Sequence, residues 1–364
     1  MRIALIKTSS MGDVIHAMPV VTDIAAGVPG ARIDWVVEES FADLPRLHPA
    51  VGDVIPVAVR RWRRTPWSPA VWSEVRAARA RLRSAGYDLA LDLQGLVKSA
   101  LVARWTGAPV AGFARGCARE PLATLAYARR YSVAMDTHAI ERLRLLAAAA
   151  LGYPLRGGPV FGLAVPATAA SWRPAQRYVV LLHATSRDEK LWPAARWSAL
   201  AATLSATGRA CVLPWGSGRE RAAARELVRA VPLSIVPPRL TLAQCAGLLA
   251  GADAVVGVDT GLTHLATALD VPTVALFAAT PAWRFGPTWS ARARSLGEDG
   301  QWPQVGEVVE ALVALGALAD DPGSGAEAPG APGAQGAQGA QGAQGAPTRG
   351  AGDGTRGAGP AGGA

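Results

Sequence analysis

The sequence predicts an α/β protein with two Rossmann-like parallel-sheet domains that face each other across a cleft. Short apolar runs alternate with longer helical patterns through most of the 364 residues, which is typical of βα units and parallel sheets. A stretch rich in Pro, Gly and Ala begins at Gly152, ends at Gln176 and divides two such series. A chain of this length exceeds one small core, so we expect two domains.

The apolar runs and their spacing place the expected elements in order. In the first half, short apolar runs predict strands at 2–6, 32–37, 53–58, 88–92 and 109–113. Helical periodicity predicts helices near 14–26, 70–86, 95–106, 120–129 and 137–151. In the second half, strands are predicted at 178–183, 210–214, 233–236, 254–258 and 273–277, with helices near 193–206, 218–230, 241–250 and 261–269. We therefore expect domains at 1–155 and 177–318, joined by a linker at 156–176.

The composition changes after about residue 320. Gly falls at every third position from Gly330 to Gly345, in Ala-Pro-Gly and Ala-Gln-Gly triplets. The tract is too short for a collagen-like helix, and its composition is typical of flexible chain. We expect 319–364 to be a disordered tail without a part in the chemistry.

Charge and cysteine content narrow the class of protein. The formal charge of +9 favours an acidic partner, such as nucleic acid, an anionic membrane face or a phosphorylated substrate. Only Lys7, Lys98 and Lys190 among the 37 basic residues are lysines, which suggests positions that need a compact point charge. Three widely spaced cysteines indicate neither a disulfide framework nor a metal knuckle, and favour a reducing cytoplasm. No apolar run approaches the ~20 residues that cross a bilayer.

The turn after the 254–258 strand is the strongest candidate for anion binding. Asp259-Thr260-Gly261 leads directly into a helix, whose free N–H groups and dipole attract a phosphate without a metal. Gly261 lets a ligand approach the backbone, and Thr260 and His264 add donors. The alternative is an ordinary βα turn with Asp259 as the helix N-cap.

Asp13 is the candidate general base of the first domain. The loop after the first strand, Lys7-Thr8-Ser9-Ser10-Met11-Gly12-Asp13, lacks both the dinucleotide and the P-loop glycine patterns. It places Asp13 at a helix start that faces the cleft. The carboxylate can take a proton from an acceptor hydroxyl or serve only as a helix cap.

Two polar loops of the second domain are candidate nucleotide contacts. Thr185, Ser186 and Lys190 follow the 178–183 strand, where Lys190 can offset the charge of a departing phosphate. Alternatively, this is a surface loop in which Lys190 pairs with a neighbouring acid. Glu220 follows the 210–214 strand and can accept both hydroxyls of a ribose, or simply begin a surface helix.

Basic and aromatic residues alternate in Arg60-Arg61-Trp62-Arg63-Arg64, with Pro66-Trp67 shortly after. Such a run fits nucleic acid or phosphorylated headgroups at a membrane, or is a solvated charge run. No recognised nucleic-acid module accompanies it, so the membrane surface is favoured.

These motifs together resemble the lipopolysaccharide heptosyltransferases of glycosyltransferase family 9. The resemblance covers about residues 1–318 and is carried by Lys7–Val14, Trp35–Glu39, Arg60–Arg63, Gln94–Ser99, His183–Thr185, Leu213–Gly216 and Asp259–His264. It implies a GT-B fold whose C-terminal helix returns toward the first domain. It also implies inverting transfer of L-glycero-D-manno-heptose from ADP-heptose to the inner Kdo (3-deoxy-octulosonic acid) of Kdo2-lipid A.

The resemblance further implies roles for individual residues. Asp13 matches the catalytic base, and Lys190 assists the leaving group. Donor contacts match Thr185, Ser186, Lys190, Glu220, Leu240, Asp259, Thr260, Gly261 and His264. Acceptor contacts match Arg60, Arg61, Arg63 and Arg119. No cofactor or essential metal is implied, nucleic acid is not expected as a partner, and the enzyme is expected on the cytoplasmic face of the inner membrane.

Other activities remain open from the sequence. The Asp-Thr-Gly-x-x-His motif does not clearly distinguish the enzymes that add the first heptose from those that add the second. Transfer of another nucleotide-activated sugar is a further alternative. So are a nucleotide-sugar epimerase on the same architecture and a nucleic-acid-binding module built on the basic run.

Overall fold

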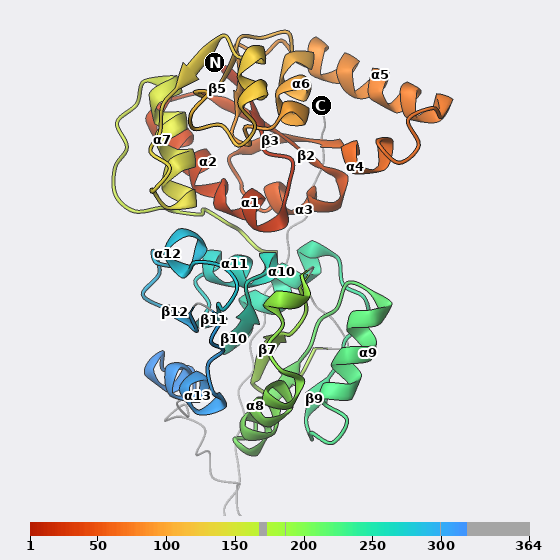
Figure 1. Cartoon of the computed structure of the whole chain (residues 1–364), viewed down its shortest axis with the longest axis vertical. Coiled ribbons are helices and arrows are strands. Elements are labelled where there is room, and N and C mark those ends of the chain that lie inside the picture. The colour runs from red at the N-terminus through yellow and green to blue at the C-terminus, as the bar shows by residue number, and fades with distance from the viewer. Residues whose placement is uncertain (167–172, 186, 299, 319–364) are drawn as a thin grey trace, which may run out of the picture. The chain divides into compact units, whose positions relative to one another are not determined.

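The computed structural model describes residues 1–166, 173–185, 187–298 and 300–318. Two six-stranded parallel sheets form its framework (Figure 1). The first, in the order β3-β2-β1-β4-β5-β6, comprises β1 (Arg2–Ile6), β2 (Arg32–Glu38), β3 (Val51–Val57), β4 (Leu89–Asp92), β5 (Val110–Phe113) and β6 (Arg129–Tyr131). The second, in the order β12-β11-β10-β7-β8-β9, comprises β7 (Tyr178–Leu182), β8 (Ala210–Val212), β9 (Ser234–Ile235), β10 (Ala254–Val258), β11 (Thr273–Leu276) and β12 (Ala293–Leu296). The predicted pair of Rossmann-like sheets is confirmed, whereas the boundaries at 155 and 177 stay predictions.

Helices connect the strands in both halves. Those of the first half are α1 (Met11–His16), α2 (Met18–Gly27), α3 (Asp43–Arg46), α4 (Val59–Trp62), α5 (Pro69–Ser84), α6 (Val97–Trp105) and α7 (Ala139–Leu151). Those of the second half are α8 (Ala194–Ala206), α9 (Gly218–Leu227), α10 (Leu242–Ala250), α11 (Gly261–Ala268), α12 (Ala282–Phe285) and α13 (Val305–Ala314). Short 3-10 helices occupy Glu39–Phe41, Pro121–Ala126 and Asp188–Lys190.

The sequence-based expectations fail at three places. The single helix expected at 14–26 is divided at Ala17 into α1 and α2, and Pro19 lies in the first turn of α2, where proline is tolerated. The helix expected at 120–129 is a 3-10 helix followed by β6. The edge strands β6 and β12 were not predicted. They carry exposed polar residues, as sheet edges commonly do, and therefore lack the apolar run by which the other strands were predicted.

The first sheet is buried on both faces. Alternate residues of a strand point to opposite faces, so Ile3 and Leu5 pack with α1, α2 and α7, whereas Ala4 and Ile6 pack with α5 and α6. This explains why the strand is apolar throughout and shows no polar alternation.

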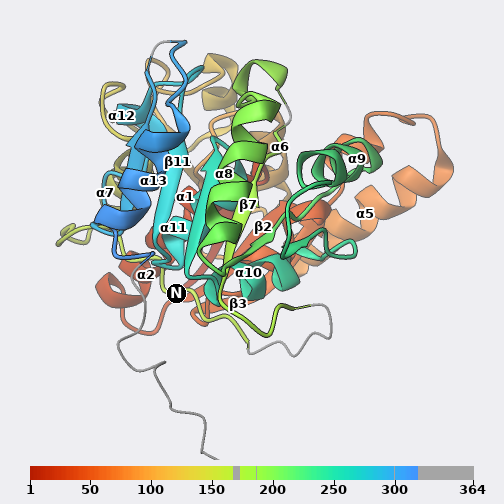
Figure 2. The ribbon, with the colours of Figure 1, turned by 90° about the horizontal axis from the view of Figure 1, so that it is seen from below.

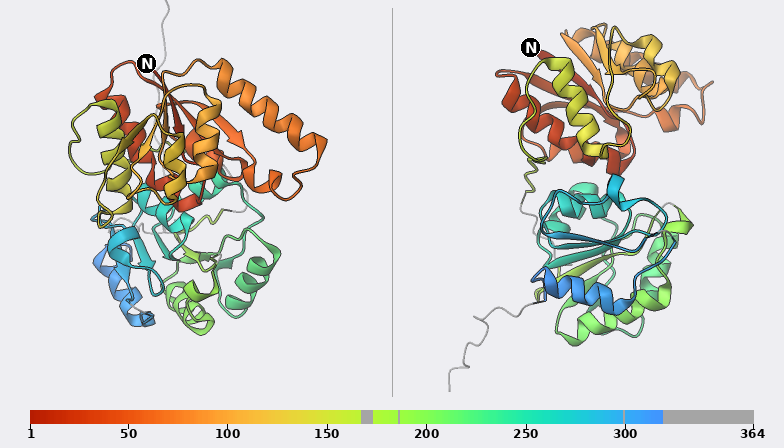
Figure 3. Two further views of the ribbon diagram at one scale, coloured as in Figure 1. Left: turned by 45° about the horizontal axis from the view of Figure 1, so that its top comes forward. Right: turned by 60° about the vertical axis from the view of Figure 1, so that its left-hand side comes forward.

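The second sheet is covered in the same way. One apolar cluster unites it with α8, α9 and α13, and another with α10 and α11. Figure 2 shows α8 and α13 across one face of this sheet, and Figure 3 shows its strands between two helix layers. The last described helix, α13, contacts α8, β11 and β12. The expectation that the C-terminal helix returns toward the first domain is therefore wrong for the described residues.

The two halves meet where α1 contacts α11 and α3 contacts α10. Two glycines allow the closer of these approaches. A Cβ on Gly12 would lie 3.0 Å from His264 Cδ2, and a Cβ on Gly261 would lie 2.5 Å from Met11 side-chain atoms. The sequence suggested that a ligand approaches the backbone at Gly261. In the structure, the side chain of Met11 approaches it instead.

Each sheet has a switch point, where the direction of the strand order reverses, and the segments that follow the strands there lead to this contact region. In each sheet the strand order reverses between two neighbours, β1 and β4 in the first and β7 and β10 in the second. Open parallel sheets bind ligands beyond the carboxyl ends of such strands. The segments after these four strands are therefore expected to supply the site.

A buried arginine fixes α7, which carries part of the site, to the rest of the first half. Arg144 is 1% exposed, and its Nε and Nη2 donate to the Asp23 carboxylate of α2 at 2.8 and 3.1 Å. Its Nη1 donates to Glu141 at 2.7 Å and to the Gly157 carbonyl at 3.1 Å. One side chain thus joins two helices and the segment after α7.

Arg144→Met should lower the free energy of unfolding by about 3–5 kcal/mol, because it leaves a nearly buried Asp23 carboxylate without its partner. Urea denaturation of the purified protein measures this loss. Arg79→Met, at an exposed position of α5, is the matched control and should change stability by less than about 0.5 kcal/mol. Equal effects of the two substitutions would contradict the structural role of Arg144.

Candidate active site

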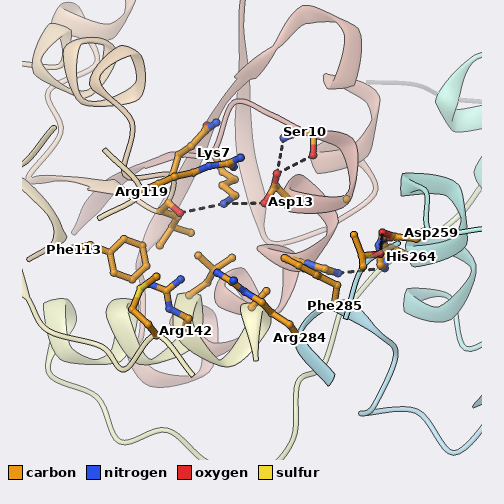
Figure 4. A pocket seen from close by; sticks show the side chains of 18 of the residues that line it. Lys7, Ser10, Asp13, Phe113, Arg119, Arg142, Asp259, His264, Arg284 and Phe285 are labelled. Atoms are coloured by element: carbon orange, nitrogen blue, oxygen red, sulfur yellow. Dashed lines mark hydrogen bonds and ion pairs between the residues drawn. The ribbon is translucent and has the colours of Figure 1, made fainter. Parts of the chain in front are cut away.

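The segments after the switch-point strands line a cavity of about 560 Å³ (Figure 4). Lys7 and Asp13 follow β1, and Gln94 follows β4. Lys190 follows β7 and Asp259 follows β10. The remaining lining side chains include His16, Phe113, Arg119, Arg142, His264, Thr280, Arg284 and Phe285.

Asp13 caps α1 and also lines the cavity, so its place as a helix cap is confirmed and its role as a base stays a prediction. Its Oδ2 accepts hydrogen bonds from Ser10 N at 2.9 Å and from Ser10 Oγ at 2.8 Å. Its Oδ1 lies 3.7 Å from Lys7 Nζ, and the side chain is 31% exposed. In the described part of the chain Oδ1 accepts no hydrogen bond, so it is the oxygen free to receive a proton.

The charge of Asp13 is held by its neighbours. Burial acts to raise the Asp13 pKa, but the Lys7 ammonium and the two Ser10 hydrogen bonds outweigh it and hold the pKa at about 2. The carboxylate is therefore ionised throughout the neutral pH range. Burial lowers the pKa of Lys7, and the Asp13 and Asp92 carboxylates oppose that shift.

The loop that carries Asp13 is held by Gln94. The Gln94 Oε1 accepts hydrogen bonds from Thr8 N and Thr8 Oγ1, both at 2.7 Å, and its Nε2 donates to the Ser9 carbonyl at 2.9 Å. Lys98 Nζ donates to Ser9 Oγ at 3.3 Å. The segment after β4 thus positions the segment after β1.

On the opposite side of the cavity, Asp259 contacts three side chains, those of Lys190, His264 and Thr280. Its Oδ2 accepts from Lys190 Nζ at 2.5 Å and from Thr280 Oγ1 at 2.6 Å, and its Oδ1 lies 3.1 Å from His264 Nε2. Burial acts to raise the Asp259 pKa, but hydrogen bonds from His264, Lys190 and Thr280 hold it below its usual range. Asp259 is therefore not the N-cap of α11, a position that Thr260 takes.

A histidine pair continues this network into the first half. His16 Nε2, on α1, lies 3.3 Å from His264 Nδ1, on α11. Burial and the adjacent His264 hold the pKa of His16 well below its ordinary value, so His16 is neutral at neutral pH. Since an ionised carboxylate only accepts hydrogen bonds, His264 Nε2 carries the proton directed at Asp259.

The family model for glycosyltransferase family 9 (heptosyltransferase) matches residues 75–309. The chain belongs to this family. It is 50% identical over 282 residues to lipopolysaccharide heptosyltransferase 1 of Pseudomonas aeruginosa, a match that covers 77% of this chain and 79% of that protein. It is 44% identical over 283 residues to the Escherichia coli K12 protein of the same name, covering 77% and 88%.

The solved structure of E. coli heptosyltransferase WaaC with ADP matches with a TM-score of 0.80 at 38% identity. The match covers 86% of this chain and all of that chain. The chain is therefore a glycosyltransferase with the GT-B arrangement of two facing parallel sheets.

The structure brings part of the expected donor set into the cavity. Lys190, Asp259 and His264 line it. Thr185 is half-buried and is not among the lining residues, and Ser186 lies outside the described residues, as do 319–364.

Four other expected donor residues are not among those that line the cavity. Thr260 and Gly261 form the start of α11. Leu240 packs against the apolar core. Glu220 closes the first turn of α9, where its Oε2 accepts from Gly216 N at 2.6 Å.

The expected acceptor arginines are divided. Arg119 lines the cavity, whereas Arg60, Arg61 and Arg63 are exposed and do not line it. Arg61 is bound by the carboxylates of Glu39 and Glu74, at 3.1 and 2.8 Å. The guanidinium of Arg60 lies over a phenylalanine ring, at 5.4 Å from its centroid.

Four charged residues of the cavity were absent from the expected site: Lys7, Arg142, Arg187 and Arg284. Lys7 could have been found from the sequence, because lysine is rare in this chain. The three arginines gave no such signal, because arginine is abundant.

Among the described residues, no group of three or more His, Cys, Asp and Glu side chains is arranged to hold a metal ion. In the same residues, no helix has the length and hydropathy needed to cross a membrane.

Lys7→Met should raise the pKa of Asp13 from about 2, because the charge that opposes burial is removed while an apolar side chain of similar length fills the site. A folded-state pKa that rises keeps the carboxyl protonated to higher pH, so the acid limb of the activity profile should move to higher pH as well. Carboxyl ¹³C chemical shifts measured against pH follow Asp13 directly. Lys98→Met, which removes an ammonium bonded to Ser9, is the control, and an unshifted Asp13 in Lys7→Met would contradict this account.

Proposed function

We propose that this glycosyltransferase moves L-glycero-D-manno-heptose from ADP-heptose to the inner Kdo of Kdo2-lipid A, with inversion at the anomeric carbon. One observation carries the proposal: a free carboxylate oxygen of Asp13 from the first half and the Lys190–Asp259 pair from the second half face one cavity. The Asp13 carboxylate can accept the proton of an attacking sugar hydroxyl, and the Lys190 ammonium can offset the charge of a departing diphosphate. The relatives are named lipopolysaccharide heptosyltransferase 1, which supports a heptose donor and a lipopolysaccharide acceptor.

The donor is proposed to bind to the second half. The start of α11, with Thr260 and Gly261, directs N–H groups and a positive dipole end at the diphosphate, and Lys190 supplies a point charge. His264, Thr185 and Ser186 are proposed as further phosphate and sugar contacts. Glu220 and Leu240 are proposed to contact the nucleoside, Glu220 through the ribose hydroxyls. A solved complex of WaaC contains ADP-2-deoxy-2-fluoro heptose, which supports this class of donor.

The reaction is proposed to be a single displacement. The acceptor oxygen attacks the anomeric carbon of heptose while its proton passes to Asp13 Oδ1. The bond between that carbon and the β-phosphate oxygen breaks, and its electron pair stays with ADP. Lys190 is already oriented by Asp259, so it offsets the new charge without rearrangement.

The acceptor is a lipid, so we propose that the enzyme works at the cytoplasmic face of the anionic inner membrane. Trp67 is 90% exposed and Trp72 is 53% exposed, and both follow the arginine run 60–64. Exposed tryptophans beside arginines suit an interface with anionic headgroups. Arg60, Arg61, Arg63 and Arg119 are proposed to contact the acceptor's acidic groups.

Purified protein with ADP-heptose should transfer heptose to Kdo2-lipid A, and not to the same acceptor that already carries one heptose. Mass spectrometry of the lipid product measures both reactions. A preference for the already heptosylated acceptor would assign addition of the second heptose instead. Conversion of the donor without any acceptor would indicate an epimerase.

Asp13→Asn should lower turnover by roughly 10²–10⁴, because the amide cannot accept the proton of the nucleophile. The change preserves size and leaves ADP affinity intact, since the donor is held by the other half. Calorimetric titration with ADP provides the control for folding and donor binding. Near-normal turnover with normal ADP affinity would exclude Asp13 as the base.

A further inference from the structure

A buried carboxylate ends the strand that leads to Gln94. Asp92, the last residue of β4, is 0% exposed, and within the described part of the chain it forms no ion pair. Its Oδ2 accepts hydrogen bonds from Tyr127 Oη at 2.7 Å and from Ser99 Oγ at 2.9 Å. A carboxylate removed from water needs such donors, and here they fix the direction in which its other oxygen points.

That other oxygen shapes the turn after β4. Asp92 Oδ1 accepts hydrogen bonds from Gln94 N at 2.9 Å and from Gly95 N at 3.3 Å, a local bond pattern typical of aspartate in turns. Gly95 has a φ of 68°, a conformation that favours glycine. The carboxylate and the glycine together bend the chain at residues 92–95.

Two contacts connect this turn to Asp13. The Leu93 carbonyl accepts a hydrogen bond from Lys7 Nζ at 3.2 Å, and Lys7 is the charge that holds the pKa of Asp13 low. The Gln94 side chain binds the loop before Asp13, where its Oε1 accepts from Thr8 N at 2.7 Å. A displaced turn would therefore move both the charged neighbour of Asp13 and the loop that carries it.

Tyr127 reaches Asp92 from the neighbouring strand. It is 4% exposed, and a Cβ on Gly112 of β5 would lie 2.5 Å from its ring. Glycine at this place in the strand thus makes the room through which the tyrosine hydroxyl reaches the carboxylate. The bond is built into the sheet, and none of these three residues lines the cavity.

We propose that Asp92 is a positioning residue for the transfer reaction, an inference that rests on the proposed function. It fixes the turn after β4, and this turn holds Lys7 and Asp13 in the arrangement that receives the proton of the nucleophile. Asp92 acts without touching substrate, because it is fully buried and does not line the cavity. Tyr127 supports it by fixing the orientation of the carboxylate.

The test compares two substitutions of Asp92. Asp92→Ala removes the acceptor that fixes the turn, whereas Asp92→Asn keeps an oxygen for Gln94 N and Gly95 N. Asp92→Ala should lower kcat by about 10- to 100-fold, the scale of loss expected when a reacting group is slightly misplaced, with an unchanged Kd for ADP. Asp92→Asn should recover most of the lost turnover. Heptose transfer to Kdo2-lipid A and calorimetric titration with ADP measure the two quantities.

The Asp13 carboxyl gives a second readout, which a loss of stability alone would not move. In Asp92→Ala the pKa of Asp13 should rise from about 2, because Lys7 and the loop no longer hold fixed places beside it. In Asp92→Asn it should remain near the wild-type value. Carboxyl ¹³C shifts recorded across the acid range follow this titration in the folded protein.

A milder pair of variants keeps the test available if Asp92→Ala does not fold. Tyr127→Phe removes one hydrogen bond to Asp92, so it should lower kcat and raise the Asp13 pKa by smaller amounts. Tyr87→Phe is the matched control, because Tyr87 Oη donates to the buried Asp34 carboxylate at 3.0 Å in the same sheet. Neither residue of the control pair lines the cavity, so both readouts should stay as in wild type.

Two results would overturn the positioning role. Normal turnover with an unmoved Asp13 pKa in Asp92→Ala, or equal behaviour of Tyr127→Phe and Tyr87→Phe, would show that the turn does not hold the base. Equal losses in Asp92→Ala and Asp92→Asn would assign the effect to the charge of Asp92 instead of the turn. Failure of the proposed function is seen separately, in wild-type enzyme that leaves Kdo2-lipid A unmodified, since the Asp13 titration needs no acceptor.

Discussion

The contact between α1 and α11 is the constraint on which the site depends. Gly12 and Gly261 remove the two Cβ atoms that would hold these helices apart, and Met11 and His264 occupy the space so gained. The bonded series His16–His264–Asp259 then runs from one half into the other. Because Asp13 lies on α1 and Asp259 closely precedes α11, this contact sets the distance between the two carboxylates that line the cavity.

The cavity uses its two kinds of cation differently. Lys7 and Lys190 each face one aspartate, where a compact ammonium holds a carboxylate ionised and in place. Arg119, Arg142 and Arg284 line the cavity and form no ion pair within the described part of the chain, whereas Arg187, which also lines it, pairs with Glu189.

The sequence predicted most strands and the polar residues that follow them, because both are marked by local sequence patterns. It did not predict features that depend on contacts between residues far apart in the chain. Apolar runs located ten of the twelve strands in the described residues, but the edge strands β6 and β12 lack such runs. Asp13 and Asp259 were predicted because each lies in the polar segment that follows a predicted strand. Arg142 lies in the first turn of α7, at a site that only the packing of α7 on the sheet brings to the cavity. The role of Gly261 also needed the fold, since its close neighbour is Met11, far away in sequence.

The low pKa of Asp13 constrains the order of events in the proposed displacement. A carboxylate held at about 2 is a weak base, and it cannot remove a proton from a sugar hydroxyl before attack begins. As the new bond to the anomeric carbon forms, the attacking oxygen gains positive charge and its proton becomes strongly acidic. The Asp13 carboxylate can then accept this proton, so in the proposed displacement proton transfer accompanies bond formation. The role that this gives to Lys7 is to keep the carboxylate free of a proton until the acceptor attacks.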